Sequence, residues 1–166
     1  MKLSVLDAIH KPAGATSAQA LRASIGLARE AERLGFHRYW VVEHHGVPFE
    51  ANPAPEVFAV ALANATSRIR IGVGGVLLNH HSPYKVAEAY RTLEALFPGR
   101  IDAGIGRAPA GPPESDLALK RVRDAATPDD HDEQVRELVG WLGNAHEPGS
   151  PFAAIRIMGD EPAGPL

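Results

Sequence analysis

An acid and two adjacent imidazoles follow a run of aromatic and β-branched residues, and this combination is well suited to chemistry. Residues Tyr39 to Val42 are typical of a buried strand, and Glu43, His44 and His45 come next. In parallel α/β proteins, ligands bind outside the carboxyl ends of the strands. Side chains alternate along extended chain, so Glu43 and His45 can share a side while His44 faces the other way. One imidazole could then act as an acid, a base or a hydrogen-bond donor; the alternative is two solvated histidines, with Glu43 bonding a backbone amide.

Glycines and an arginine end the next two predicted strands. Gly74 and Gly75 close one of them, where the absence of side chains lets a ligand or a neighbouring chain approach, although a simple bulge or turn also accounts for them. Arg107 follows the other among small residues, which suits an anion such as phosphate; a surface ion pair with Glu114 is the alternative. The sequence contains no glycine-rich phosphate-binding fingerprint.

Histidines also raise the question of a metal site. The residues that could in principle converge at strand ends are Asp7, His10, Glu43, His44 and His81. The sequence has neither the spacing of two ligands on one strand nor a zinc-binding HExxH helix, so we expect no metal. His80 and His81 could reach the candidate site, but ordinary loop polarity explains them equally well.

Short apolar runs alternate with helical patterns along the chain. The predicted strands are Leu3 to Leu6, Tyr39 to Val42, Ile69 to Val73, Ile101 to Ile105 and, as a further candidate, Ala153 to Met158. Helices are expected to start with Ser17 as a cap, at Pro55, at Ser82 with Pro83, and at Asp129 or Asp130, while a proline-rich loop follows Arg107. This alternation predicts an α/β fold with a parallel sheet and outer helices. Periodicity alone does not choose between an open doubly wound sheet and half of a βα barrel.

Composition narrows the classes of protein. The 166 residues are a one-domain length, and a net charge of −3 gives no sign of a nucleic-acid partner or an acidic membrane surface. Cysteine is absent, which excludes disulfides and fits a reducing compartment. No apolar stretch approaches the roughly 18 residues that span a bilayer, and the start of the chain lacks a signal peptide's apolar core. We therefore expect a cytoplasmic protein with no membrane partner.

Several segments together carry a resemblance to a known family. They are Ala28 to Phe36, Arg38 to Trp40, Glu43 to His45, Ala65 to Gly72, Val86 to Glu88, Leu93 to Leu96, Pro98 to Asp102 and Gly104 to Ala108. In this order and spacing, Leu21 to Ala108 resembles the N-terminal half of the bacterial luciferase-like flavin monooxygenases. The resemblance continues more loosely to about Ile157. It implies a βα barrel, which selects the second of the two architectures.

The resemblance also implies a cofactor and roles for individual residues. Family members use reduced flavin mononucleotide (FMN), or a deazaflavin in some branches, with molecular oxygen acting on a small organic substrate; a flavin reductase is a possible partner. His44 matches the catalytic histidine beside the flavin, and Arg107 matches the arginine that holds the flavin phosphate. Gly74 and Gly75 match the position that packs on the flavin ring, often through a non-proline cis peptide. Glu43 is expected to fix the neighbouring loop at the cofactor site. Asn79, His80 and His81 replace the usual Pro-Asn-His.

Length is the main departure from the family. A TIM-type βα barrel needs about 250 residues, so the expected domain is a single truncated one over residues 1–166, with an ordered half barrel of four to five parallel strands over 1–158 and a tail over 159–166. The open strand edges invite association. We expect the inner face to lose partners at the following residues or their neighbours: Leu3, Val5, Val41, Ile71 and Ile101. The expected outcomes are a homo-oligomer, marginal stability, or a fragment of a longer gene product, with weak FMN binding by the monomer. The alternative function is a non-catalytic relative that serves as an assembly module.

Overall fold

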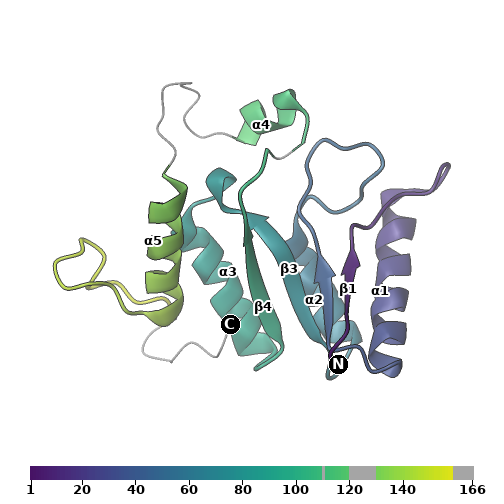
Figure 1. The fold of residues 1–166 in the computed structure, drawn as a ribbon, viewed down its shortest axis with the longest axis horizontal. Helices are drawn as coiled ribbons and strands as arrows, with labels where there is room; N and C mark the ends of the chain where they lie inside the picture. The colour runs from purple at the N-terminus through teal and green to yellow at the C-terminus, as the bar shows by residue number, and fades with distance from the viewer. Residues whose placement is uncertain (110, 120–129, 159–166) are drawn as a thin grey trace.

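Four strands and their connecting helices form the core of the molecule. The computed structural model describes residues 1–109, 111–119 and 130–158. The elements in chain order are β1 (Ser4–Asp7), α1 (Ser17–Arg33), β2 (Arg38–Val41), α2 (Pro55–Ala65), β3 (Arg70–Leu77), the 3-10 helix η1 (Leu78–His80), α3 (Pro83–Leu96), β4 (Ile101–Gly106), α4 (Pro113–Leu119) and α5 (His131–Gly143). Figure 1 shows the strands side by side, with α2 and α3 behind them, α1 beside β1 and α5 beside α3.

The sheet is parallel throughout and its strands follow chain order, β1-β2-β3-β4. Each strand is joined to the next through a helix, which is the βα repetition that the sequence predicts. The arrangement is that of the first half of a TIM-type barrel, so the predicted α/β class and partial barrel are confirmed. The third strand is longer than predicted, because it runs beyond Val73 through the glycines to Leu77.

The helices cover one face of the sheet. Val41, Ile71 and Ile101 are at most 1% exposed and belong to the same core as Phe58 and Leu62 of α2. These three residues therefore do not face the barrel interior, and of the two alternatives in the prediction it is their strand neighbours Trp40, Gly72 and Asp102 that do. Strand alternation explains this, since a shift of one position exchanges the two faces and the apolar run alone does not say which is which.

The opposite, inner face carries a different set of residues. Leu6, Trp40, Gly72 and Asp102 are level with one another across the four strands. Leu6 is 67% exposed on this face. The indole of Trp40 covers the adjacent glycines, because a Cβ on Gly72 would overlap the indole and a Cβ on Gly104 would lie 3.4 Å from it. Glycines on β3 and β4 thus make room for one large aromatic ring on β2.

Charged residues occupy the amino end of the inner face. The Asp102 carboxylate accepts hydrogen bonds from Arg38 Nε at 3.0 Å and from Arg70 Nε at 2.8 Å. Burial acts to raise the pKa of Asp102, but the two guanidinium groups outweigh it and hold that pKa below its usual range. This network joins β2, β3 and β4 at the edge opposite the predicted site.

The sequence signals for helix starts predicted some of the observed caps correctly. Pro55 is the first residue of α2, as predicted. The cap of α1 is Thr16 and not Ser17, because Thr16 and Gln19 form a reciprocal capping box. Ser82 occupies the cap position of α3, as expected, but its side chain makes no capping hydrogen bond. Asp130 likewise precedes α5 without a side-chain cap.

Two segments near the carboxyl end differ from expectation. The region after Arg107, predicted as a loop, contains the short helix α4, which begins at Pro113 with acidic residues in its first turn. The candidate fifth strand over 153–158 is instead a series of turns and bends, and Ile157 is held by Asn144, whose side chain bonds both the amide and the carbonyl of Ile157. The predicted tail over 159–166 lies outside the described residues. Within the described ranges, every helix is too short or too polar to cross a membrane.

Candidate active site

The predicted site residues gather at one edge of the sheet. His44 follows the end of β2, Gly74 and Gly75 lie within the last part of β3, and Arg107 directly follows β4. Because the strands are parallel, these positions share the carboxyl edge. The ends of the second and fourth strands therefore border one region.

A buried carboxylate organises this edge. Glu43 Oε1 lies 2.8 Å from His45 Nε2 and 2.7 Å from His81 Nε2, and Glu43 Oε2 accepts the amide of Leu77 at 2.9 Å. The side chain of Glu43 is only 2% exposed. Glu43 therefore ties the segment after β2 to the end of β3 and to the start of α3.

The charges of this group favour the ionised pair. Burial acts to raise the pKa of Glu43, but the hydrogen bonds from His81, His45 and the Leu77 amide outweigh it, so the pKa lies below its usual range. The hydrogen bond that His81 donates to Glu43 raises the pKa of His81 against the opposing effect of burial, and the charge of Glu56 adds to the rise. Glu43 thus serves as the acceptor that holds the two histidines and the Leu77 amide together.

His44 points away from that group, as strand alternation predicts. Its Nδ1 atom forms an ion pair with Glu50 Oε2, while 42% of its side chain is exposed. The sharing of one side by Glu43 and His45 is confirmed by their hydrogen bond. The alternative of two solvated histidines fails for His45, whose side chain is 15% exposed. The same alternative proposed that Glu43 bonds a backbone amide, and that bond is present, with the Leu77 amide as the donor.

The two glycines of β3 differ in their surroundings. They are joined by a cis peptide bond at a register shift between Val73 and Val76. A Cβ on Gly75 would lie 2.7 Å from the backbone nitrogen of Gly106, so here the neighbouring chain is β4 itself. Gly74 is exposed, and a Cβ there would lie 3.0 Å from the Trp40 indole. Of the two, Gly74 is the position with backbone open to a ligand.

The remaining predicted residues divide between the rim and the interior. Arg107 is exposed beyond the end of β4. His81 reaches the site through Glu43, but His80 is a buried residue whose Nε2 lies 3.2 Å from the carbonyl of Ala108 and 3.5 Å from Asp116 Oδ1. His80 therefore braces η1 against the segment that follows β4.

The residues considered as metal ligands do not converge. Asp7 accepts hydrogen bonds from the Ile9 amide, from Ser24 and from Tyr39, so both of its oxygens are occupied. Across residues 1–109, 111–119 and 130–158, no group of three or more histidine and acidic residues has a geometry that could hold a metal. Glu43 and Glu50 instead pair with separate histidines.

Sequence reasoning missed Glu50 and the covering role of Trp40. Glu50 belongs to no motif, and its contact with His44 depends on a fold of the long connection between β2 and α2. Trp40 did have a signal: an aromatic residue on one strand and glycines at level positions on its neighbours. The segment after β4 also returns to the site, since Gly111 lies so close to the carbonyl of His45 that a side chain there would collide with it.

Comparison with known proteins shows the family to which the chain is similar. The model of the luciferase-like monooxygenase family matches residues 1–150. A luciferase-like monooxygenase of Escherichia coli (strain K12) is 41% identical over 158 residues, which cover 95% of this chain and 47% of that protein. An N-acetyl-S-alkylcysteine monooxygenase of Bacillus subtilis (strain 168) is 42% identical over 161 residues, which cover 94% of this chain and 46% of that protein.

A solved structure shows the same likeness in three dimensions. The crystal structure of apo-MsnO8 matches with a TM-score of 0.85 and 44% identity, covering 99% of this chain and 46% of that one. The chain thus spans about half the length of the relatives that it matches. From the family match over most of its residues and from these identities, the chain belongs to the luciferase-like monooxygenase family.

Proposed function

We propose that this chain supplies the flavin-binding half of a flavin-dependent monooxygenase that acts on a small organic molecule. The observation that carries the proposal is the placement of His44, with one ring nitrogen paired to Glu50, at the sheet edge that also holds Gly74 and Arg107. Membership of the luciferase-like monooxygenase family supports the reaction class. It also favours this function over that of a non-catalytic assembly module.

The residues at this edge fit a flavin with a phosphate tail. Gly74 offers exposed backbone without a side chain, and Arg107 offers an exposed guanidinium with the geometry that phosphate prefers. Reduced FMN, when bound, supplies the electrons with which molecular oxygen is activated. His44 would take or give a proton at its exposed edge, and Glu43 holds the segment that carries His44. A deazaflavin would use the same residues.

The relatives suggest the first substrates and partners to test. Because one relative at 42% identity is an N-acetyl-S-alkylcysteine monooxygenase, S-alkyl thioethers are the first substrate class for this chain. A flavin reductase would provide the reduced cofactor. The uncovered edges of β1 and β4 in the described sheet support association of two copies, which size-exclusion chromatography would measure.

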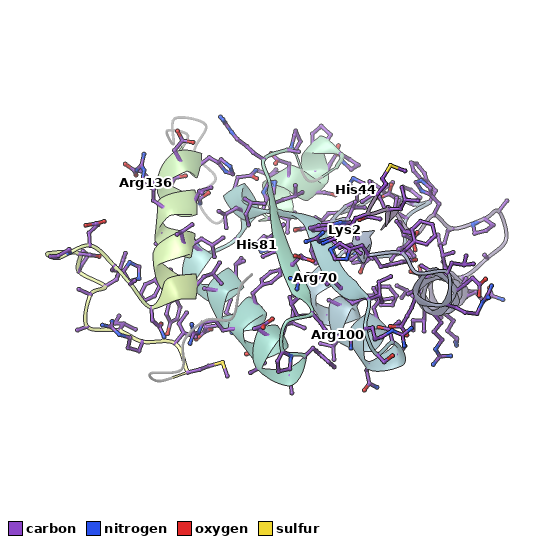
Figure 2. The ribbon with its side chains drawn as sticks, turned by 60° about the horizontal axis from the view of Figure 1, so that its bottom comes forward. Lys2, His44, Arg70, His81, Arg100 and Arg136 are labelled. Atoms are coloured by element: carbon purple, nitrogen blue, oxygen red, sulfur yellow. The ribbon has the colours of Figure 1, made fainter. Side chains whose placement is uncertain are left out.

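The cofactor part of the proposal is tested by titrating FMN and riboflavin into the 166-residue chain and following flavin fluorescence. With one arginine predicted for the phosphate, we expect FMN to bind more weakly than about 1 μM. Arg107→Ala should weaken FMN binding by at least about tenfold and leave riboflavin unchanged, because only FMN carries the phosphate. Arg136→Ala is the matched control, since Arg136 is an exposed residue of α5 far from His44 (Figure 2). Equal losses for both flavins in Arg107→Ala would contradict the phosphate assignment.

The catalytic part of the proposal is tested with His44→Ala. We expect FMN affinity to change by less than about threefold, while oxygenation of an S-alkyl thioether with supplied reduced FMN falls by at least about a hundredfold, the range of one lost acid–base group. Mass spectrometry of the oxygenated product measures the rate. If affinity and oxygenation fall equally, His44 is a binding residue and the assignment fails.

A further inference from the structure

His44 and Glu50 meet through one buried atom of each side chain. His44 Nδ1 and Glu50 Oε2 form an ion pair, and each of the two atoms is shielded from solvent. Neither atom has a hydrogen-bond partner in the part of the chain that the structure describes, so the ion pair is the contact that accounts for both. The side chain of Glu50 is 9% exposed, so the carboxylate cannot exchange His44 for bulk water without moving. Each of these two atoms therefore has the other as its partner, while the second oxygen, Glu50 Oε1, lies 3.7 Å from Nδ1 of the exposed His10.

Glu50 is held in place independently of His44. The connection between β2 and α2 runs antiparallel to the segment after β1, with Glu50 level with His10. The Lys11 amide donates to the carbonyl of Phe49 at 2.7 Å, and the Ala51 amide donates to the carbonyl of Ile9 at 3.2 Å. Backbone hydrogen bonds thus flank Glu50 on both sides. The loop that carries the carboxylate is therefore held by bonds that do not involve His44.

The pairing determines which nitrogen of His44 carries the proton. An ionised carboxylate only accepts hydrogen bonds, so Nδ1 must be the protonated nitrogen. In the neutral ring Nε2 is then unprotonated and can accept a hydrogen bond or a proton. Because Nδ1 is buried while 42% of the side chain is exposed, the accessible part of the ring is the part away from Nδ1.

The neighbouring histidines have the reverse arrangement. His45 and His81 both present Nε2 to Glu43, with side chains 15% and 31% exposed. Their Nε2 atoms are engaged in holding the strand ends together. Of these three histidines, His44 is therefore the one whose Nε2 remains available at the carboxyl edge of the sheet.

We propose that Glu50 is a positioning residue that holds His44 with Nδ1 protonated and Nε2 directed to the reacting molecule. Nε2 can then take one proton from that molecule, and the imidazolium that forms faces the Glu50 carboxylate across Nδ1–H. The proton returns from Nε2 when the step reverses. This inference rests on the proposed function, because it assigns a partner to the residue expected to act there.

The test reads the ring of His44 directly. Nitrogen-15 NMR of the imidazoles of the 166-residue chain, assigned with His44→Gln, reports which nitrogen is protonated above neutral pH. We expect the Nδ1–H form for His44 in the wild type, a shift to the Nε2–H form that is favoured in water for Glu50→Ala, and partial retention of the Nδ1–H form for Glu50→Gln, whose amide oxygen still accepts. Glu30→Ala, which removes an exposed carboxylate paired with Arg33 on α1, should leave His44 unchanged.

The readout separates this inference from the proposed function. An unchanged His44 tautomer in Glu50→Ala would overturn the inference even if the chain oxygenates substrate. If the tautomer shifts but the wild type neither binds flavin nor oxygenates, the pairing stands and the proposed function fails. Where the chain is active, Glu50→Ala should lower kcat by at least about tenfold with little change in FMN affinity, and Glu50→Gln should recover part of the loss. A fall in FMN affinity equal to the fall in kcat would mark Glu50 as merely structural. If Glu50→Ala does not fold, Glu50→Gln carries the NMR test, and a wild type with His44 in the Nε2–H form overturns the inference by itself.

Discussion

Two glutamates on the same connection, between β2 and α2, each face histidines and yet have different consequences. Glu43 bonds His45, His81 and the Leu77 amide, which joins separate parts of the sheet edge. Glu50 pairs with His44 and leaves much of that imidazole exposed. The residue types are the same in both groups. What distinguishes them is whether the histidine nitrogen that could act on a ligand is already engaged.

The largest expected effect on stability comes from removing Glu43. Glu43→Ala leaves the Leu77 amide and the buried edges of two histidines without their acceptor, so we expect a loss of about 3–5 kcal/mol in the free energy of unfolding. Glu50→Ala, at a more exposed pair, should cost about 1 kcal/mol. Urea unfolding of both variants measures the two losses. A smaller loss for Glu43→Ala than for Glu50→Ala would reverse the assignment of the structural carboxylate.

The pH dependence of stability should follow the Glu43 group. The folded pKa of Glu43 lies below 4.5, so its contribution is present above that pH and is lost as the pH falls through the folded pKa. The folded pKa of His81 lies above 6.5, so its contribution is complete below pH 6.5 and is lost as the pH rises through the folded pKa.

Stability from this pair should therefore be greatest between those two values, 4.5 and 6.5. Thermal unfolding from about pH 3 to about pH 9 tests this, with Glu43→Gln as the comparison. The variant should lose the decline at the alkaline side, because the Glu43 charge is the main cause of the raised His81 pKa. A wild type and a variant with parallel profiles would contradict it.

The smallest expected effect concerns His10, the second histidine near Glu50. Its side chain is 66% exposed, and its Nδ1 lies 3.7 Å from Glu50 Oε1. Exposed pairs of this kind contribute little, so His10→Ala should change the free energy of unfolding by less than about 0.5 kcal/mol. The His44 tautomer should also stay as it is, since backbone bonds hold the Glu50 loop. A large loss on urea unfolding would show instead that His10 anchors Glu50.

The fold was predictable to the extent that local patterns carried it. Alternating apolar strands and capped helices led to the parallel order, and the start of α2 at Pro55 followed from its preset backbone angle. The extension of β3 to Leu77 was not predictable, because glycines normally weaken a strand and here β4 and Trp40 occupy the space beside them. The segment over 153–158 looked like a strand, yet Asn144 holds it as turns.

The candidate site was predictable only along single strands. Strand alternation correctly placed Glu43 with His45 and placed His44 opposite, because that rule needs nothing beyond neighbouring residues. The alternation rule cannot identify the partners of these side chains, because the partners come from other segments. His81, which follows η1, contacts Glu43. Glu50 contacts His44 because its loop pairs with the segment after β1.

Chain order and residue chemistry were enough to predict the sheet edge at which the candidate residues lie, and the family resemblance singled out His44 among its imidazoles. They could not name the carboxylate that each imidazole faces, nor tell the helix-covered side of Val41 and Ile71 from the inner side of Trp40. The reason is physical. Which face a strand residue takes and which nitrogen a histidine exposes depend on packing between segments distant in sequence, and a one-residue shift or a rotated ring reverses either outcome.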